Sequence, residues 1–298
     1  MRVLVSGATG FVGRFIVEHL TAAGETVIAG CRRAPDTGFF SRPIESRFLA
    51  LDPALDQSSA FDGIDVFVHA AFQHVPGRYR GGEGDDPEGF RLANSAGSIR
   101  LFEAARAAGV SRCLFLSSRA VYGRQPPGIS MTEETPVDPV SLYGLVKLEA
   151  ERALAGLDRD GFATASLRAT GVYGEGAPGK GNKWTPLLDE YLRRKPVADR
   201  VGTEVHGDDL AAAVLCLIRS PADMMRGVFN VSDILTGYRD VLAIAAQTLG
   251  SQHPLPEAAD GSDFNAMDTE RLRALGWQPG GRAKLEETVR RMAAAHRV

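Results

Sequence analysis

Three closely spaced glycines near the start of the sequence constrain the fold more than any other feature. The segment Gly7-Ala-Thr-Gly-Phe-Val-Gly13 follows a short apolar run, Val3–Ser6, and opens a stretch with apolar residues at helical spacing, Phe11–Ala23. Glycines between a strand and a helix allow a tight turn, a close approach of the backbone to a pyrophosphate, and close helix packing. The helix N-terminus adds N–H groups and the positive end of its dipole. We therefore expect a dinucleotide to be bound by Gly7, Gly10, Phe11, Val12 and Gly13.

Short apolar runs alternate with helical patterns through the first half of the chain. The runs predicted as buried strands are Val3–Ser6, Thr26–Gly30, Phe48–Leu51, Val66–Ala71, Cys113–Ser117 and Thr164–Arg168. The stretches predicted as helices are Phe11–Ala23, Glu88–Ala108 and Leu142–Leu157. Near-continuous apolar strands are typical of a parallel sheet covered on both faces. The alternation predicts an α/β fold with a doubly wound parallel Rossmann sheet.

The pattern changes at about Glu175. Helices are predicted at Thr185–Arg194, Asp208–Ser220, Gly237–Leu249 and Ala283–His296, with one more strand at Phe229–Val231. We expect a dinucleotide-binding Rossmann domain of residues 1–174, to which residues 201–232 return. Residues 175–200 and 233–298 would form a smaller, mostly helical C-terminal lobe. Because ligands bind beyond the carboxyl ends of the strands in such sheets, this lobe is expected to bind the substrate.

Composition narrows the class of partner. The 298 residues carry a net charge of -3, which provides no basic surface for nucleic acid or an anionic membrane. The three cysteines have no metal-ligand spacing, so we expect buried free thiols, no metal site and a reducing compartment. No apolar run is long enough for a membrane span, and the N-terminal run is too short for a signal peptide. These features predict a cytoplasmic protein that acts on a small molecule.

The end of the second predicted strand bears on the choice of dinucleotide. An acidic residue at that point usually binds the ribose 2′-hydroxyl of NAD, whereas an arginine accommodates the 2′-phosphate of NADP. The strand ends in Ala29-Gly-Cys-Arg-Arg33, without an acid. Arg32 and Arg33 are able to clamp a phosphate bidentately, although two solvated arginines would give the same pattern. The sequence favours NADP, with NAD as the alternative.

A tyrosine and a lysine four residues apart, Tyr143 and Lys147, lie on the same face of a predicted helix. A free tyrosine has a pKa of about 10, and a nearby ammonium group together with a nicotinamide ring lowers it by favouring the phenolate. The strand that precedes this helix ends in Ser117-Ser118, where a parallel sheet presents polar groups to its ligand crevice. We expect Ser118, Tyr143 and Lys147 to be catalytic.

These residues resemble the extended short-chain dehydrogenase/reductases of the NAD-dependent epimerase/dehydratase family. The resemblance covers nearly the whole chain. Besides the glycine loop, Ser118, Tyr143 and Lys147, it includes Leu51-Asp52, His69-Ala-Ala71, Asn94, Ser117-Ser-Arg-Ala-Val-Tyr-Gly123, Leu167-Arg168, Val172-Tyr-Gly174, Val205-His-Gly-Asp-Asp-Leu210, Phe229-Asn-Val231 and Leu275-Gly-Trp-Gln-Pro279.

The resemblance implies a role for each matching position. Tyr143 would be the acid/base, Lys147 would bind the nicotinamide ribose and tune Tyr143, and Ser118 would orient the substrate. Asp52 would bond the adenine, and Asn94 would order a proton relay or its helix. The remaining cofactor contacts would come from Ala70, Ala71, Ala169 and Thr170. A homodimer packed through the helices that hold Asn94 and Tyr143 is common in the family.

Three departures from the family pattern narrow the activity. Ser118 is followed by Arg119-Ala120, whereas sugar-nucleotide 4,6-dehydratases have Asp-Glu there, so dehydration is not expected. Gly171 and Gly202 stand where nucleotide-sugar 4-epimerases usually carry an asparagine and an arginine for the substrate diphosphate. Replacements for the missing pair would have to come from Arg200, Lys180 or Lys183.

The resemblance implies an NAD(P)-dependent oxidoreductase of a sugar, a nucleotide-sugar or a related alcohol or ketone. The alternative is a nucleotide-sugar 4-epimerase with a retained cofactor, and a third possibility is a cofactor-sensing regulatory protein. The substrate is expected to contact Phe72, Gln73, Ser118, Arg119 and Gly171. We expect His206 to lie at a helix entry capped by Asp208 rather than to act in catalysis, and Trp184 to pack within the lobe.

Overall fold

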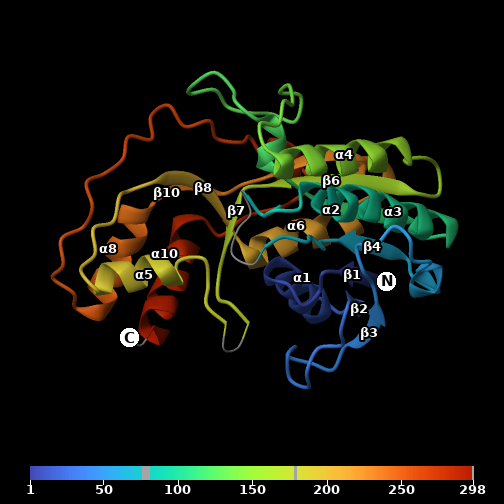
Figure 1. The fold of residues 1–298 in the computed structure, drawn as a ribbon, viewed down its shortest axis with the longest axis horizontal. Coiled ribbons are helices and arrows are strands. Elements are labelled where there is room, and N and C mark those ends of the chain that lie inside the picture. Colours follow the sequence, from blue (N-terminus) through green and yellow to red (C-terminus); the bar gives the residue numbers. More distant parts are fainter. Residues whose placement is uncertain (76–80, 178–179, 297–298) are drawn as a thin grey trace.

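The chain folds around one large parallel sheet and one small sheet (Figure 1). The computed structural model describes residues 1–75, 81–177 and 180–296. The strands of the large sheet, in spatial order, are β3 (Glu45–Phe48), β2 (Thr26–Cys31), β1 (Arg2–Ser6), β4 (Val66–His69), β5 (Arg112–Ser118), β6 (Ala163–Ala169) and β9 (Gly227–Val231). All neighbouring pairs in this sheet are parallel, which confirms the predicted doubly wound Rossmann fold.

Helices cover both faces of the large sheet. On one face lie α1 (Phe11–Ala22) and α6 (Gly207–Arg219), which pack on each other, and on the other lie α3 (Ser98–Ala107) and α4 (Leu142–Gly156). Two separate apolar clusters fill these interfaces. The inner strands are buried on both sides because their side chains meet helices above and below the sheet.

The second sheet was not predicted. It consists of β10 (Ile234–Gly237), β8 (Val201–His206) and β7 (Gly171–Tyr173), with β8 parallel to β7 and antiparallel to β10. These strands are short and contain glycine and threonine, so they lack the apolar runs of the large sheet. Pairing between distant segments of the chain, rather than local pattern, makes them strands.

Three helices, α5 (Thr185–Leu192), α8 (Tyr238–Leu249) and α10 (Gly281–Ala295), share a further apolar cluster. They form a group beside the large sheet (Figure 1). The short helices α7 (Ala222–Met225) and α9 (Glu270–Arg273) lie near β6 and β9, respectively. We propose that the substrate lobe is built on this cluster and the small sheet, while α6 and β9 belong to the dinucleotide-binding domain.

Two predicted elements, one strand and one helix, are corrected. The strand predicted at Phe48–Leu51 is β3, Glu45–Phe48, an edge strand with mostly exposed side chains that pairs with β2. An edge strand needs no apolar pattern, and the apolar run that follows it misled the prediction. The helix predicted at Glu88–Ala108 consists of α2 (Pro87–Arg91), a π-helical turn η2 (Leu92–Gly97) and α3, and Ala108 is exposed.

Candidate active site

The loops that follow β1 and β4 meet at the carboxyl edge of the large sheet. Strand order reverses between these two strands, which is where open α/β sheets bind their ligands. Gly7 has a φ of +67°, and a Cβ on it would lie 2.7 Å from the backbone nitrogen of Ala71. Only glycine fits this conformation and this approach. The predicted cofactor residues Gly7, Ala70 and Ala71 are therefore brought together.

The glycine loop has the form needed to hold a pyrophosphate. A Cβ on Gly13 would overlap the carbonyl oxygen of Gly7, so the start of α1 packs directly on the turn. Gly10 is the N-cap residue of α1 and makes no side-chain cap, so the first N–H groups of Phe11, Val12 and Gly13 face no capping side chain. This arrangement fits a dinucleotide bound at a helix N-terminus.

Three residues predicted to contact the adenosine half lie at the same edge of the sheet. Arg32 and Arg33 are exposed and directly follow β2. Asp52 is exposed, and its Oδ1 accepts a hydrogen bond from the backbone nitrogen of Ala54 at 3.0 Å. The π-helical turn approaches this segment closely, because a Cβ on Gly97 would lie 2.9 Å from the carbonyl carbon of Leu51.

Ser118 is the last residue of β5 and is only 8% exposed. Its Oγ accepts a hydrogen bond from the backbone nitrogen of Ala120 at 3.2 Å, which caps the short 3-10 helix η3 (Arg119–Tyr122). Helix α4 packs against both β5 and η3. The contact is close because a Cβ on Gly144 would lie 2.6 Å from the carbonyl oxygen of Ala120. Ala120, two residues after Ser118, thus lies against Gly144, the residue after Tyr143.

Phe72 connects the tyrosine and the lysine of α4. Its ring lies perpendicular to that of Tyr143, with 5.1 Å between centroids. The Nζ of Lys147 lies 4.6 Å from the Phe72 centroid and 4.8 Å from that of Phe115, and it donates a 2.7 Å hydrogen bond to the carbonyl oxygen of Leu116. Lys147 is 5% exposed, and this burial lowers its pKa from 10.5 to about 7.

Asn94 holds the loop that contains Phe72 and Gln73. Its side-chain oxygen accepts from the backbone nitrogen of Gln73 at 2.8 Å, and its amide nitrogen donates to the carbonyl oxygens of Gln73 and Phe90. Asn94 is 2% exposed and lies within the π-helical turn, a feature often found at functional sites. The amide therefore positions the loop beside Tyr143, while the Gln73 residue itself is exposed.

A buried chain of hydrogen bonds, which sequence reasoning missed, joins Asn94 to the glycine loop. Oγ of Ser98 donates to the carbonyl oxygen of Asn94, so it must accept from Nε2 of His69. Nδ1 of His69 then accepts from Oγ of Ser6, which itself accepts from the backbone nitrogens of Ala70 and Ala71. Burial keeps His69 neutral by lowering its pKa to about 3, with the Lys147 charge contributing. The sequence signals were a histidine at the end of an apolar run and its place in the segment His69-Ala-Ala71 of the family resemblance.

On the other side of the site, Ala169 ends β6 opposite Ser118. The hydroxyl of the next residue, Thr170, points to β8, where it donates to the carbonyl oxygen of Thr203 at 2.6 Å. Gly171 begins β7 and pairs with Glu204 of β8. Sequence reasoning did not single out Glu204, because an acid in an unpredicted strand has no local signal.

Arg119 is turned toward a late segment of the chain. Its Nη2 donates to the carbonyl oxygen of Asn265 at 2.8 Å, and its guanidinium lies 4.9 Å from the ring centroid of Phe264. The residue predicted to contact substrate thus anchors the segment between α8 and α9 at the start of η3.

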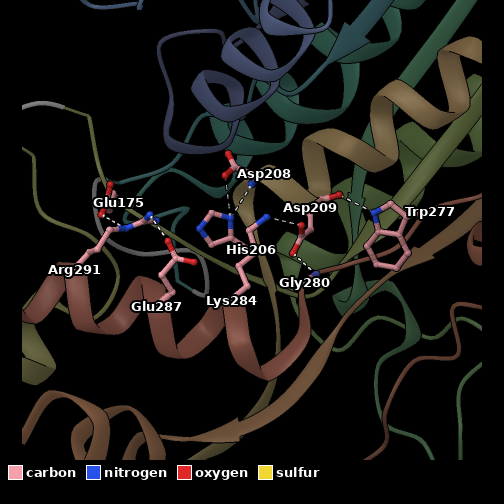
Figure 2. A network of polar contacts seen from close by, with 9 residues as sticks. All are labelled: Glu175, His206, Asp208, Asp209, Trp277, Gly280, Lys284, Glu287 and Arg291. Atoms are coloured by element: carbon pink, nitrogen blue, oxygen red, sulfur yellow. Dashed lines mark hydrogen bonds and ion pairs between the residues drawn. The ribbon is translucent and has the colours of Figure 1, made fainter. Parts of the chain in front are cut away.

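One predicted cap is wrong. His206, not Asp208, caps α6, because its Nδ1 accepts from the backbone nitrogen of Asp208 at 3.1 Å (Figure 2). His206 is 2% exposed and packs its ring edge-on against Phe15 and Tyr173, and burial lowers its pKa. Figure 2 also shows Lys284 of α10 reaching Asp209 of α6. Nζ of Lys284 donates to Oδ1 of Asp209 at 2.6 Å.

Trp184 packs within the lobe as expected, stacked on Tyr173 with 5.2 Å between centroids. Within residues 1–75, 81–177 and 180–296, no three side chains of the metal-binding types come together as a metal site. In the same part of the chain, no helix is both long and apolar enough to cross a membrane. Cys31 and Cys113 are buried free thiols, whereas Cys216 is partly exposed.

Comparisons with known proteins agree with this geometry. Residues 3–232 match the model of the NAD dependent epimerase/dehydratase family. The chain is 33% identical to the dTDP-6-deoxy-L-talose 4-dehydrogenase (NAD(P)(+)) of Kitasatospora kifunensis, over 99% of this chain and 95% of that one. It is 28% identical to the UDP-glucose 4-epimerase of Lactobacillus helveticus, over 94% and 92% of the two chains.

The fold also matches a solved structure that contains NAD. The UDP-glucose 4-epimerase of Thermus thermophilus in complex with NAD superposes with a TM-score of 0.80 at 27% identity, covering 99% of this chain and 100% of that one. The sequence resemblance is confirmed by the family match, the relatives and the fold. This chain belongs to the NAD dependent epimerase/dehydratase family, as an NAD(P)-dependent enzyme.

Proposed function

We propose that the chain transfers hydride to or from a sugar, a nucleotide-sugar or a related alcohol or ketone, with Tyr143 as the acid/base. The observation that carries the proposal is the convergence of Ser118 and α4 at the carboxyl edge of β5, beside the glycine loop. The nicotinamide cofactor supplies or accepts the hydride when it is bound. The oxygen of Tyr143 takes the proton of an alcohol in one direction and returns it to a carbonyl oxygen in the other.

Lys147 supports the proton transfer by its charge. It lies one helical turn from Tyr143, and its ammonium group favours the phenolate form of that residue. Because burial lowers the pKa of Lys147 to about 7, the charge that tunes Tyr143 varies with pH near neutrality. Ser118, which is buried at the end of β5, orients the reacting oxygen by a hydrogen bond from its hydroxyl.

The glycine loop and the start of α1 would hold the pyrophosphate of the cofactor, with Asp52 at the adenine and Ala169 and Thr170 near the nicotinamide. For the ribose, Arg32 and Arg33 favour NADP, because both are exposed at the end of β2 and carry the charge that a 2′-phosphate requires. NAD is the alternative, and it is the cofactor present in the Thermus thermophilus structure.

A nucleotide-sugar 4-epimerase is the second candidate, favoured by the relatives that carry this name. An epimerase oxidises and re-reduces one carbon, so it leaves its cofactor unchanged after turnover. A net oxidoreductase changes the near-ultraviolet absorbance of the nicotinamide in proportion to product. Following that absorbance together with product formation separates the two candidates.

Exposed apolar side chains support a homodimer through the helices that hold Asn94 and Tyr143. Leu92 of the π-helical turn and Leu145 of α4 are exposed, as is Val140 just before α4. The ion pair between Arg91 and Glu149 joins the two helices at this surface. Sedimentation velocity of the wild type and of Leu145→Glu tests the proposal, and a monomeric wild type contradicts it.

The substitution Tyr143→Phe tests the proposed chemistry. It removes the phenolic oxygen but keeps the ring that packs on Phe72, so turnover should be lost while the dissociation constant of the cofactor stays nearly unchanged. Tyr238→Phe, which removes the same oxygen from a partly buried tyrosine at the start of α8, is the matched control and should keep its turnover. Full turnover by Tyr143→Phe overturns the proposed mechanism.

A further inference from the structure

A carboxylate occupies the space above the first residue of β7. A Cβ built on Gly171 would lie 2.5 Å from Oε2 and 2.9 Å from Oε1 of Glu204. Glu204 pairs directly with Gly171 across the small sheet, so its side chain covers this glycine from the neighbouring strand. Position 171 has no room for a side chain while Glu204 keeps this conformation.

This carboxylate lies at the wall of the proposed substrate site. Gly171 follows Ala169 by two residues, and Ala169 pairs with Ser118 at the carboxyl edge of the large sheet. Thr170, between them, is fixed by its hydrogen bond to Thr203, the residue before Glu204. Gly171, the glycine that Glu204 covers, therefore lies two residues beyond the β6 position that pairs with Ser118.

Glu204 is held in place by a lysine. Nζ of Lys183 forms an ion pair with Oε2 of Glu204, and the side chain of Glu204 remains 13% exposed. The contact of Lys183 is to Oε2 alone, and within the described residues no hydrogen bond reaches Oε1. The ammonium group of Lys183 is thus paired with a carboxylate of the protein itself.

Further carboxylates act on Tyr173 together with Glu204, and one of them, Asp209, is paired with Lys284 of α10. Burial raises the pKa of Tyr173 well above its ordinary value, and the carboxylates of Asp209, Asp233 and Glu204 add to this increase. Asp233 follows β9, and its backbone nitrogen donates to the carbonyl oxygen of Glu204. Arg119, a cation that the sequence predicted to contact substrate, is engaged with Asn265 and Phe264. An anionic group placed against Gly171 would meet like charge.

We propose that Glu204 determines substrate specificity: it selects a free sugar or polyol, whose hydroxyl donates to the Glu204 carboxylate, and it disfavours a nucleoside diphosphate at the same position. A carboxylate accepts hydrogen bonds from hydroxyl groups but has no donor for a phosphate oxygen. The inference deepens the proposed function, on which it rests, by naming the substrate class of that site. It also favours the net oxidoreductase over the nucleotide-sugar epimerase.

Binding of UDP to the cofactor-loaded enzyme tests the proposal without any turnover. Calorimetry should show about tenfold or more tighter UDP binding to Glu204→Gln than to the wild type, because the isosteric amide removes the repulsion. Lys183→Met should weaken UDP binding further, since it leaves the carboxylate uncompensated. Glu257→Gln makes the same substitution at an exposed glutamate and should leave UDP binding unchanged. The same measurements in Tyr143→Phe separate this proposal from the proposed chemistry.

Steady-state kinetics provide a second test of the proposal. Free hexoses and polyols should have lower KM values than UDP-glucose and dTDP-glucose, and Glu204→Gln should raise the KM for the free sugar more than it lowers kcat. UDP binding that is equal or weaker in Glu204→Gln overturns the proposal, and so does a lower KM for UDP-glucose than for free glucose. Absence of turnover with every substrate, together with the expected change in UDP binding, overturns the proposed function alone.

Discussion

The Nζ of Lys147 donates a 2.7 Å hydrogen bond to the carbonyl oxygen of Leu116, and the charge lies between the rings of Phe72 and Phe115. Burial of this charge opposes folding, because the unfolded chain keeps the proton up to pH 10.5 and the folded chain only up to about 7. Below the folded pKa the destabilisation is complete, and it disappears as the pH rises toward the unfolded value. The same charge is the one proposed to tune Tyr143, so stability and activity make opposite demands on this residue.

Lys147→Met should therefore stabilise the protein at acidic pH and inactivate it. The free energy of unfolding should exceed that of the wild type at about pH 6, by about 1.4 kcal/mol for each unit of pKa shift, and the gain should shrink toward about pH 10. Urea unfolding at several pH values measures the difference. Lys195→Met, at an exposed lysine, should show no such pH dependence. A gain that is equal at all pH values would contradict the pKa of about 7.

Gly13→Ala should destabilise the glycine loop and abolish cofactor binding. The added Cβ would overlap the carbonyl oxygen of Gly7, which is backbone and has no room to move without opening the turn. Overpacking of this kind costs about 1–3 kcal/mol or more. Thermal unfolding and cofactor titration measure the two effects. Gly156→Ala is the matched control, because its Cβ would meet nothing within 4 Å at the end of α4, and it should be neutral or stabilising.

Asn94→Ala should loosen the loop that carries Phe72. It removes two part-buried hydrogen bonds to the backbone nitrogen and carbonyl oxygen of Gln73, and each such bond contributes about 0.5–1.5 kcal/mol. We expect lower stability and a fall in kcat, since Phe72 packs on Tyr143. Ser95→Ala, at the next buried residue of the same π-helical turn, should have a much smaller effect. Equal losses of stability and kcat in both variants would mean that the packing of the π-helical turn, and not the Asn94 amide, holds the loop.

Replacing Arg32 and Arg33 by alanine should weaken NADP binding about tenfold or more, because the charge-assisted hydrogen bonds to the 2′-phosphate are lost. NAD binding should change little, since NAD carries no such phosphate. Dissociation constants for both cofactors, measured at low and high salt, provide the test. Arg42→Ala, at an exposed arginine in the loop that precedes β3, is the control. Wild-type binding of NAD about tenfold or more tighter than NADP would refute the preference.

The inner strands of the large sheet and the shared helix face of Tyr143 and Lys147 were predictable because their signals are local. The inner strands are near-continuous apolar runs. The turn after β1 requires a glycine at position 7, because only glycine fits its backbone conformation and the close approach of Ala71. Tyr143 and Lys147 lie one turn apart on a single helix, so their spacing alone places them on one face.

The features that escaped prediction depend on partners distant in the sequence. The small sheet joins Gly171, Glu204 and Ile234, which no periodic pattern connects. Both His206 and Asp208 carry a side-chain acceptor that could cap the N-terminus of α6. His206 is the residue that caps it, because its ring is held in place by packing against Phe15 and Tyr173. Local sequence offered no way to rank the two.

The path of the chain between the two sheets has a consequence for how the protein assembles. The chain leaves the large sheet after β6, contributes β7, α5 and β8 elsewhere, and returns through α6 to add β9 beside β6. A fragment that ends at Gly174 would leave β6 as an open edge and expose the apolar face of α1 that α6 covers. The two halves of the molecule are interleaved along the chain, so such a fragment should aggregate, and the intact protein should unfold as one cooperative unit.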